Sequence, residues 1–326
     1  MVKKCAIIPG MSESILPSDF IVRLKDLYPS EWSEIITALQ TGRPTTFRVN
    51  TLKIPVATAI AELSQAGFEL SRASLNNAFV LKNKTIRDLE EHSLYQAGAL
   101  YVQGLSSMIP ALLLDPQPDE SILDCAAAPG SKTTQIAALM NNEGMILAND
   151  TSRVRLYKLK ANIEKQGVTI VHVKQGMGQH LWQDFPEVFD KVLVDVPCSM
   201  EGRFRADRPK TIADWSLRKI KELSERQKFM LLAAVSCARP GGRIVYSTCT
   251  LAPEENEAVI SWVLKKTKGS VVVEEPTQLS ITMQPGLMTW YDSVFDEQVK
   301  NTRRILPTKL FEGFYVAVLK KVKSNL

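Results

Sequence analysis

The sequence predicts an α/β protein in which a doubly wound, mostly parallel sheet follows a small N-terminal α+β subdomain. From about residue 120 onward, short apolar segments typical of buried strands alternate with helical segments. The first of these strands runs into a loop of small residues that leads directly into a helix. The N-terminal part instead reads as helices followed by a small mixed unit.

The length of 326 residues favours two domains or one large domain with an appendage. The N-terminal unit is predicted over residues 1–92. It contains the strand-like segments TFRVNTLK and NAFVLK, separated by a helix that ends at Gly67. Residues 95–114 are apolar and helix-permissive, and they lead into the larger unit, 93–326.

The larger unit alternates strands with helices, as βα units do. Its predicted strands are 121–125, 145–150, 169–173, 191–196, 242–248 and 313–321. Its predicted helices are 132–140, 153–166, 226–238 and 254–266. Sheets of this kind bind their ligands beyond the C-terminal ends of the strands, so the chemistry is expected there.

The composition is that of a globular protein, with 45% hydrophobic and 23% charged residues. No apolar run reaches the ~18 residues needed to span a bilayer. The apolar stretch within Met1 to Met11 is too short for a signal peptide. These features predict a cytoplasmic protein with no membrane association.

Five cysteines are widely spaced, with no C-x-x-C pair, in a chain with only three histidines. They are Cys5, Cys125, Cys198, Cys237 and Cys249. An odd number without paired spacing excludes a disulfide framework, and the same pattern excludes a structural zinc site. Each cysteine is therefore either a core residue, the commoner case, or part of a reaction site.

The first strand of the larger unit ends in DCAAAPGSKTT, a loop that opens a helix. Its small residues let a ligand approach the backbone, and its N–H groups favour a carboxylate or polar tail. A phosphate-binding P-loop is excluded because Ser131 separates Gly130 from Lys132, and the dinucleotide motif G-x-G-x-x-G is absent. The residues predicted to bind a cofactor here are Ala126, Ala127, Ala128, Pro129, Gly130, Ser131 and Lys132.

Asp150 closes the second strand, 18 residues after Lys132. An acid at this place accepts hydrogen bonds from the ribose hydroxyls of a nucleoside cofactor. Asp150 taken alone is equally consistent with a helix N-cap, because TSRVRL follows it. The small-residue loop nearby favours the cofactor role.

Two further segments place cysteines at predicted strand ends: DVPCS (195–199) and STCT (247–250). Two inert core cysteines would rarely share this placement. At these residues the chain resembles the Sun (Fmu) family of RNA 5-methylcytosine methyltransferases, most closely its RsmF-type members, which act on small-subunit ribosomal RNA. The similar segments are FRVNTLK (47–53), ALYVQGLSSMIP (99–110), LDCAAAPGSKTTQIA (123–137), NNEG (141–144), DVPCSMEGRFR (195–205), GGRIVYSTCTLAPEENEAV (241–259) and GFYVAVL (313–319).

The resemblance implies a Rossmann-like class I methyltransferase that uses S-adenosyl-L-methionine. In the strand order of that class the first, fourth and fifth strands are neighbours, so the two cysteines, Asp195 and the cofactor loop would converge. The family implies that Cys249 is the nucleophile and that Cys198 helps to release the product. It also places Asp195 and Asp150 at the base and cofactor sites, and an RNA-binding role on the N-terminal part.

The chemistry explains why two thiols are useful. Carbon 5 of cytosine is a poor nucleophile until a thiolate adds to carbon 6. After methyl transfer the carbon 5 proton must leave and the protein–base bond must break, which a second group assists. A carboxyl group on the amino edge of the base would stabilise the adduct, and Asp195 is predicted to supply it.

The chain departs from the family pattern at three positions. Gln175 stands where an acid usually binds adenine, and its amide can still hydrogen-bond the adenine edge. Met200 replaces a glycine, and Ala206 replaces a basic residue. The chain ends soon after its last predicted strand, so its length resembles that of small archaeal relatives that methylate transfer RNA.

The expected partner is RNA, either ribosomal RNA in the small subunit or transfer RNA, with no obligate protein partner. Residues 203–228 hold nine Lys or Arg against four acids, and a chain net charge of +5 permits nucleic-acid binding. Arg203, Arg205 and Arg208 are predicted RNA contacts, and Trp215 is expected to be exposed. A solvated helix face explains the charges equally well, and they would suit DNA too.

Two other functions remain as alternatives. One is an RNA-binding ribosome-assembly factor whose methylation is incidental or lost, which the intact Cys198, Asp195 and Cys249 disfavour. The other is methylation of an exocyclic amine, which typically uses [DN]-P-P-[YF] after the fourth strand. DVPC does not match that pattern.

Overall fold

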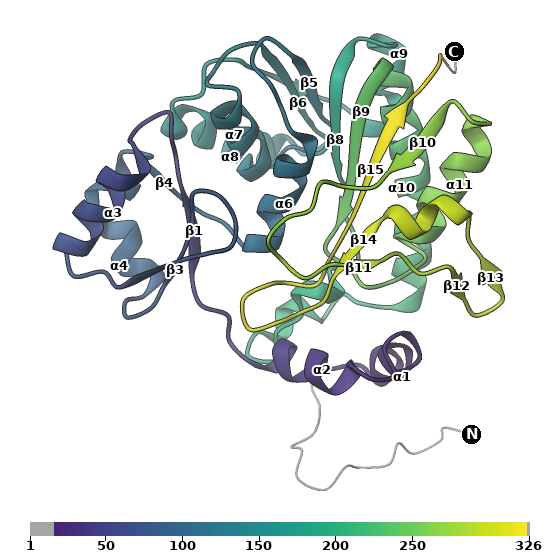
Figure 1. The fold of residues 1–326 in the computed structure, drawn as a ribbon, viewed down its shortest axis with the longest axis horizontal. Coiled ribbons are helices and arrows are strands. Elements are labelled where there is room, and N and C mark those ends of the chain that lie inside the picture. Colours follow the sequence, from purple (N-terminus) through teal and green to yellow (C-terminus); the bar gives the residue numbers. More distant parts are fainter. Residues whose placement is uncertain (1–15, 325–326) are drawn as a thin grey trace, which may run out of the picture.

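The computed structural model describes residues 16–324, so Cys5 and the segment Met1 to Met11 lie outside the described residues. A nine-stranded sheet with helices on both faces forms the larger unit, and a separate four-stranded sheet forms the smaller one (Figure 1). The predicted α/β class with a small N-terminal subdomain is confirmed. None of the helices described over these residues is long and apolar enough to cross a membrane.

The large sheet is parallel at its centre and antiparallel at one side. In order across the sheet, its strands are β11 (Gln284–Pro285), β14 (Arg303–Ile305), β15 (Phe314–Lys321), β9 (Ala238–Thr248), β8 (Phe189–Asp195), β5 (Ser121–Asp124), β6 (Met145–Asp150) and β7 (Val171–Gln175). A further strand, β10 (Val271–Glu274), also pairs with β15. Strand β8 runs parallel to both β5 and β9. The C-terminal ends of these three strands therefore meet at one edge, as predicted.

Helices cover both faces of this sheet (Figure 1). One face carries α6 (Leu105–Leu114), α7 (Ser131–Leu139) and α8 (Arg153–Gln166); the other carries α9 (Leu181–Asp184), α10 (Leu217–Cys237) and α11 (Glu257–Thr267). Successive side chains of β8 point to opposite faces of the sheet. Val192 and Val194 lie in the core under α10, and Leu193 lies in the core under α6 and α7. Burying each such side chain contributes about 1.5–3 kcal/mol.

The smaller sheet is antiparallel. Its order is β2 (Leu70–Arg72), β3 (Ala78–Leu81), β1 (Thr46–Val49) and β4 (Leu100–Val102), and it is accompanied by α3 (Val56–Gln65), α4 (Ile86–Glu91) and α5 (Ser93–Gln96). Phe47, Leu63 and Leu89 lie in its core. Because β4 pairs with β1, this sheet extends past the predicted boundary at residue 92. The same strand interrupts the stretch 95–114 that was expected to be helix-permissive throughout.

The first two helices, α1 (Ser18–Leu27) and α2 (Trp32–Gln40), pack against the larger unit instead of the small sheet. The rings of Phe20 and Phe204 lie 5.0 Å apart between centroids. Arg23 donates two hydrogen bonds, of 3.0 and 2.7 Å, to Glu254. These contacts hold the loops that follow β8 and β9, so the predicted unit 1–92 is divided between two places in the fold.

Several short elements were not predicted. They are β10, β11, β12 (Thr289–Trp290), β13 (Ser293–Val294), β14, η1 (Gly178–His180), η2 (Glu201–Arg203), η3 (Pro209–Thr211) and η4 (Glu297–Asn301). Segments of two to five residues are too short to show a hydrophobic period. Helix α10 also begins at Leu217, nine positions before the predicted start, where Ser216 caps it by accepting a hydrogen bond from the Lys219 N–H.

Candidate active site

The two strand-end cysteines lie together. The Sγ atoms of Cys198 and Cys249 are 3.2 Å apart, and the Cys249 N–H donates to the Cys198 Sγ at 3.3 Å. Cys198 is buried, whereas Cys249 is half-buried. The Cys198 S–H, which donates to the Cys249 sulfur, and the burial of Cys198 together raise the pKa of the Cys198 thiol well above its usual value. Of the two sulfurs, that of Cys249 is therefore the more accessible to a ligand, and that of Cys198 keeps its proton.

Asp195, at the end of β8, connects three neighbouring elements. Its Oδ2 accepts a 2.6 Å hydrogen bond from the Lys132 ammonium, and its Oδ1 accepts a 2.8 Å bond from the Ser247 hydroxyl. Lys132 also donates to the Ser107 Oγ at 2.9 Å. Lys132 was predicted within the cofactor loop, and its ammonium lies at the Asp195 carboxylate, so its contact with a cofactor stays a prediction.

A buried carboxylate fixes the loop that carries Cys198. The Glu255 side chain accepts hydrogen bonds from the Ser199 N–H at 3.0 Å, from the Ser199 hydroxyl, and from the Gln227 amide at 2.8 Å. Burial raises the pKa of Glu255 to about 7, although these hydrogen bonds oppose that shift. Glu255 thereby ties the segment after β8 to the segment after β9.

A second buried carboxylate, Glu201, ties the same two segments. It accepts hydrogen bonds from the Thr250 hydroxyl at 3.0 Å and from the Leu251 N–H at 3.2 Å. It also accepts one from the Trp215 indole at 2.9 Å. Trp215 is half-buried against Phe20, so the expectation that it is exposed was wrong. Its indole N–H needed a partner, and the local sequence does not reveal one.

The backbone around this loop is tightly constrained. A Cβ on Gly202 would lie 2.0 Å from the Gly313 carbonyl oxygen, so only glycine fits there. Met200, which stands where the family pattern has glycine, adopts a left-handed conformation with φ of 64°. A non-glycine residue in this region costs roughly 1–2 kcal/mol. The loop that follows Cys198 is therefore held in its conformation at some cost in free energy.

The small-residue loop lies between the end of β5 and the start of α7. A Cβ on Gly130 would lie 2.9 Å from Leu159, so glycine allows α8 to approach closely. The Ala127 N–H donates to the Asn149 carbonyl at 2.7 Å, and the Ala128 N–H donates to the Asp150 Oδ2 at 3.3 Å. The prediction that the N–H groups of this loop are available to a ligand was wrong for these amides, because β6 already binds them.

Asp150 is buried beside this loop at the end of β6. Its Oδ2 also pairs with the Arg155 guanidinium at 2.9 Å, and its Oδ1 accepts from the Ser152 N–H at 2.9 Å. The N-cap of α8 is Ser152 and not Asp150. Because a carboxylate has about four lone-pair sites, one site on Oδ1 stays available for a ligand. Gln175, at the end of the neighbouring strand, is exposed and donates to the Thr151 carbonyl at 3.2 Å.

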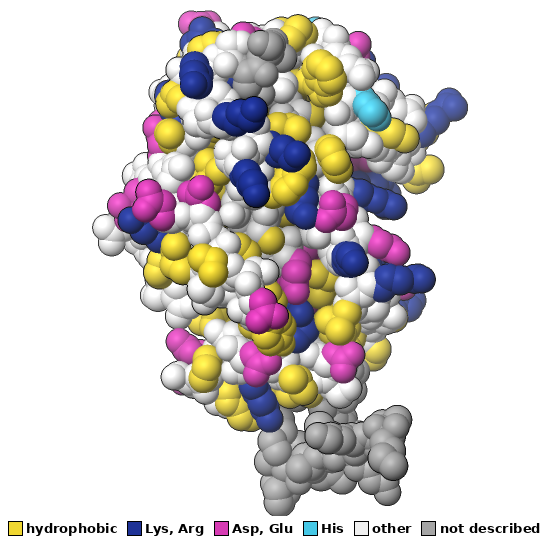
Figure 2. All heavy atoms as spheres, turned by 90° about the vertical axis from the view of Figure 1, so that its right-hand side faces the viewer, with side chains coloured by type: hydrophobic (Ala, Val, Ile, Leu, Met, Phe, Trp, Pro, Cys, Tyr) yellow, Lys and Arg dark blue, Asp and Glu magenta, His cyan; other side chains and the backbone are white. Residues whose placement is uncertain are grey.

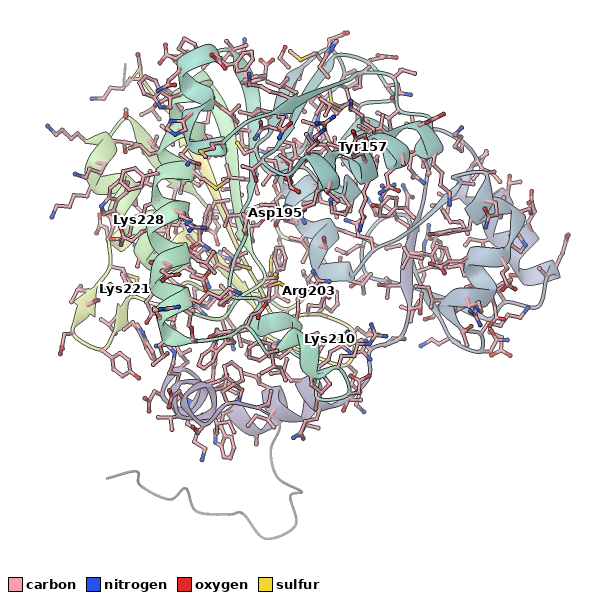
Figure 3. The ribbon with its side chains drawn as sticks, turned by 180° about the vertical axis from the view of Figure 1, so that it is seen from behind. Tyr157, Asp195, Arg203, Lys210, Lys221 and Lys228 are labelled. Atoms are coloured by element: carbon pink, nitrogen blue, oxygen red, sulfur yellow. The ribbon has the colours of Figure 1, made fainter. Side chains whose placement is uncertain are left out.

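The three predicted RNA-contacting arginines follow Cys198. Arg203 pairs with Glu312 at 3.4 Å, Arg205 pairs with Asp207 at 2.6 Å, and Arg208 is exposed. Figure 3 shows Arg203 on the loop after Asp195. Glu312 raises the pKa of Arg203, and the Asp195 carboxylate adds to this effect, as either neighbouring sulfur does when it is ionised. The Arg203 cation therefore lies within electrostatic reach of both thiols.

Sequence reasoning missed several residues of this site: Arg43, Ser107, Arg155, Ser247 and Glu255. Ser247 and Glu255 lie inside segments that were recognised, so their proximity to Cys249 was the available signal. Arg43, which lies in the segment before β1, donates to the Gly202 carbonyl at 3.3 Å, although the two residues are 159 positions apart in the sequence. No local pattern could have indicated that contact.

Comparison with known proteins agrees with this arrangement. The profile of the family described as 16S rRNA methyltransferase RsmB/F matches residues 111–320, and that of the RsmF/B-like ferredoxin-like domain matches residues 16–86. The chain is 35% identical over 322 residues to ribosomal RNA small subunit methyltransferase F of Vibrio cholerae, covering 95% of this chain and 64% of that protein. It thus spans less than two thirds of the length of that relative.

Two archaeal proteins are also similar. A tRNA (cytosine(49)-C(5))-methyltransferase of Pyrococcus abyssi is 39% identical over 279 residues, covering 84% of this chain and 87% of that protein. The crystal structure of NSun6 from Pyrococcus horikoshii with SFG superposes with a TM-score of 0.80 at 27% identity, covering 95% and 99% of the two chains. Together with the family profile, these similarities confirm the resemblance drawn from the sequence: the chain belongs to the RsmB/F methyltransferase family.

Proposed function

We propose that this protein is an S-adenosyl-L-methionine-dependent methyltransferase that forms 5-methylcytidine in structured RNA, with small-subunit ribosomal RNA as the first candidate substrate. The observation that carries the proposal is the pair of thiols 3.2 Å apart, on loops that follow β8 and β9, beside the Asp195 carboxylate. The name of the ribosomal relative supports methylation of small-subunit ribosomal RNA, and that of the transfer RNA relative supports methylation at carbon 5 of cytosine.

The residues present fit a nucleoside cofactor, because the end of β6 offers a carboxylate and the end of β7 offers an amide at the edge where the loop before α7 lies. When bound, the cofactor supplies an electrophilic methyl group. The Cys249 thiolate forms a bond to carbon 6 of cytosine, and the displaced electron pair makes carbon 5 nucleophilic. After carbon 5 is methylated, its proton passes to water, the electrons of that C–H bond restore the C5–C6 double bond, the S–C6 bond breaks and Cys249 leaves as thiolate.

The other side chains have distinct parts in this scheme. Asp195 accepts a hydrogen bond from the amino group of the base. Lys132 and Ser247 hold the Asp195 carboxylate in place. Cys198, which keeps its proton, donates a hydrogen bond to the departing Cys249 sulfur 3.2 Å away and so assists elimination of the product. The start of α11 supplies no evident activation of the nucleophile.

Substitution of Asp150 tests the cofactor site. We expect Asp150→Ala to weaken binding of S-adenosyl-L-methionine by about 1–3 kcal/mol, because hydroxyl groups of the ligand lose their acceptor. Calorimetric titration measures this. The matched control is Asp292→Ala, which removes an exposed carboxylate outside the site and should bind the cofactor as tightly as wild type. Equal affinity of Asp150→Ala and wild type would remove Asp150 from the site.

Neutralising Arg203, Arg205 and Arg208 together tests RNA binding at the catalytic edge. We expect the slope of log affinity against log salt concentration to fall by about 1–2. Three full phosphate contacts would give a larger change, but Arg203 and Arg205 already pair with acids. The control Lys158→Gln/Lys300→Gln removes exposed charges elsewhere. An unchanged slope in the arginine variant would reduce this segment to a solvated surface.

Transfer RNA is the second candidate substrate, favoured by the 39% identical relative that this chain covers over 87% of its length. Bisulfite sequencing of ribosomal and transfer RNA from a strain that lacks the gene separates the two. Loss of one methylated cytosine from either class identifies the substrate, and an unchanged pattern in both contradicts the proposed function.

A further inference from the structure

A groove lies on the face formed by α10 and α11, away from the cysteines. It has a volume of about 1160 Å³, and its lining includes the C-terminal half of α10, the end of α11 and residues near the end of β15. Strand β15 runs antiparallel to β9, so its last residues lie where β9 begins, at the edge of the sheet opposite Cys249. Helix α10, roughly 30 Å long at 1.5 Å per residue, connects the two edges.

The groove is basic. Its lining includes Arg226, Lys266, Lys268 and Lys323, all exposed. Within the part of the chain that the structure describes, none of these four takes part in an ion pair. Glu225 also lines the groove, but it is already paired with Lys228 at 2.7 Å. Figure 2, which views the side carrying α11, shows Lys and Arg side chains gathered in its upper half with hydrophobic side chains between them.

Exposed aromatic rings accompany these charges. Phe229 is 52% exposed and Trp182 is 41% exposed, and both line the groove. Phe229 packs edge-on against Trp262 with 5.5 Å between ring centroids. A single exposed ring needs no explanation, but two exposed rings that line one groove form an apolar surface of the kind that marks a binding site. Basic side chains interleaved with exposed rings are the features that bind single-stranded nucleic acid, through phosphate contacts and base stacking.

From this combination we propose that the groove binds a single-stranded segment of RNA that flanks the structured target, as a second RNA site remote from the thiols. The excess of positive charge identifies a polyanion as the occupant, and the exposed rings select one with unpaired bases. The inference rests on the proposed function, since it extends the RNA substrate from the catalytic edge along α10. RNA bound at both ends of α10 would hold the substrate more tightly than the catalytic pocket alone.

The test uses a fluorescein-labelled oligouridine 15-mer, which contains no cytosine, and measures its binding to the full chain by fluorescence anisotropy over a range of salt concentrations. We expect Lys266→Gln/Lys268→Gln to lower the salt slope by about 1.4, the value for two phosphate contacts to a single strand. The matched pair Lys158→Gln/Lys300→Gln removes the same charge outside the groove and should leave the slope unchanged. Phe229→Leu keeps the packing on Trp262 but removes the ring, and it should weaken binding between about 5-fold and 150-fold, the equivalent of one stacked base.

Photo-cross-linking with 4-thiouridine in the same RNA locates the contact, and the expected sites are Trp182 and Phe229. Equal slopes for the two lysine pairs, or cross-links confined to residues 195–210, overturn the proposal. A groove that serves a protein partner instead would leave all RNA affinities unchanged, which also overturns it. Methylation of small-subunit ribosomal RNA is measured in parallel. If the groove variants lose oligouridine binding while the wild-type protein methylates no RNA, the proposed function is wrong but the groove is still an RNA-binding site.

Discussion

Replacement of Cys198 by alanine is expected to trap the protein on its RNA as a covalent adduct, whereas replacement of Cys249 abolishes both the adduct and methyl transfer. The two thiols are only 3.2 Å apart, so a structural role would treat them alike. The proposed mechanism does not, because only the Cys249 thiolate forms the bond to carbon 6 and only Cys198 assists its cleavage. Loss of the nucleophile should lower turnover by about 10⁴-fold or more.

Denaturing gels of each variant incubated with RNA and S-adenosyl-L-methionine measure this directly. The RNA should present the target cytosine in a loop, where unstacking the base costs least. A slow-migrating band in Cys198→Ala that is absent from the double variant Cys198→Ala/Cys249→Ala assigns both roles. A band in Cys249→Ala instead would reverse the assignment, and full activity of both single variants would exclude covalent catalysis by these cysteines.

The parts of the site that the sequence predicted are those carried on contiguous segments. Cys198 and Cys249 each follow a buried strand directly, and the order of the parallel strands brings the ends of β8 and β9 to one edge. The pattern of strands and helices predicts each strand, because period-two burial and βα alternation are local properties, whereas the order of the strands was implied by the family resemblance. The chemical roles of these residues remain predictions.

What the sequence did not reveal depends on contacts between distant segments. The bond from Lys132 to Ser107 joins residues 25 positions apart, and the indole of Trp215 is held by the buried Glu201. Similarly, β4 follows the predicted boundary at residue 92 but pairs with β1, which lies before it. These partners are chosen by tertiary packing, so a residue's own neighbours in the sequence carry no signal for them.

The second large effect is expected at Asp195. Asp195→Asn should lower kcat by about 10²–10³-fold, because the carboxylate that stabilises the developing charge on the base becomes a neutral amide. The same change leaves the Lys132 ammonium, whose side chain is 9% exposed, without its counter-charge. Because the Asp195 side chain is 28% exposed, the loss of unfolding free energy should be about 1–3 kcal/mol, below the cost of breaking a fully buried pair.

These two consequences can be separated with a second variant. Lys132→Met/Asp195→Asn removes both charges, so urea denaturation should show that its stability recovers most of what Asp195→Asn loses. Methyl transfer to RNA should stay as slow as in Asp195→Asn, since the amide still faces the base. If the double variant instead regains turnover together with stability, Asp195 acts only by neutralising Lys132, and another group must hold the amino edge of cytosine. Cofactor titration on both variants completes the comparison, because a chemical role at the base predicts affinity for S-adenosyl-L-methionine close to that of wild type.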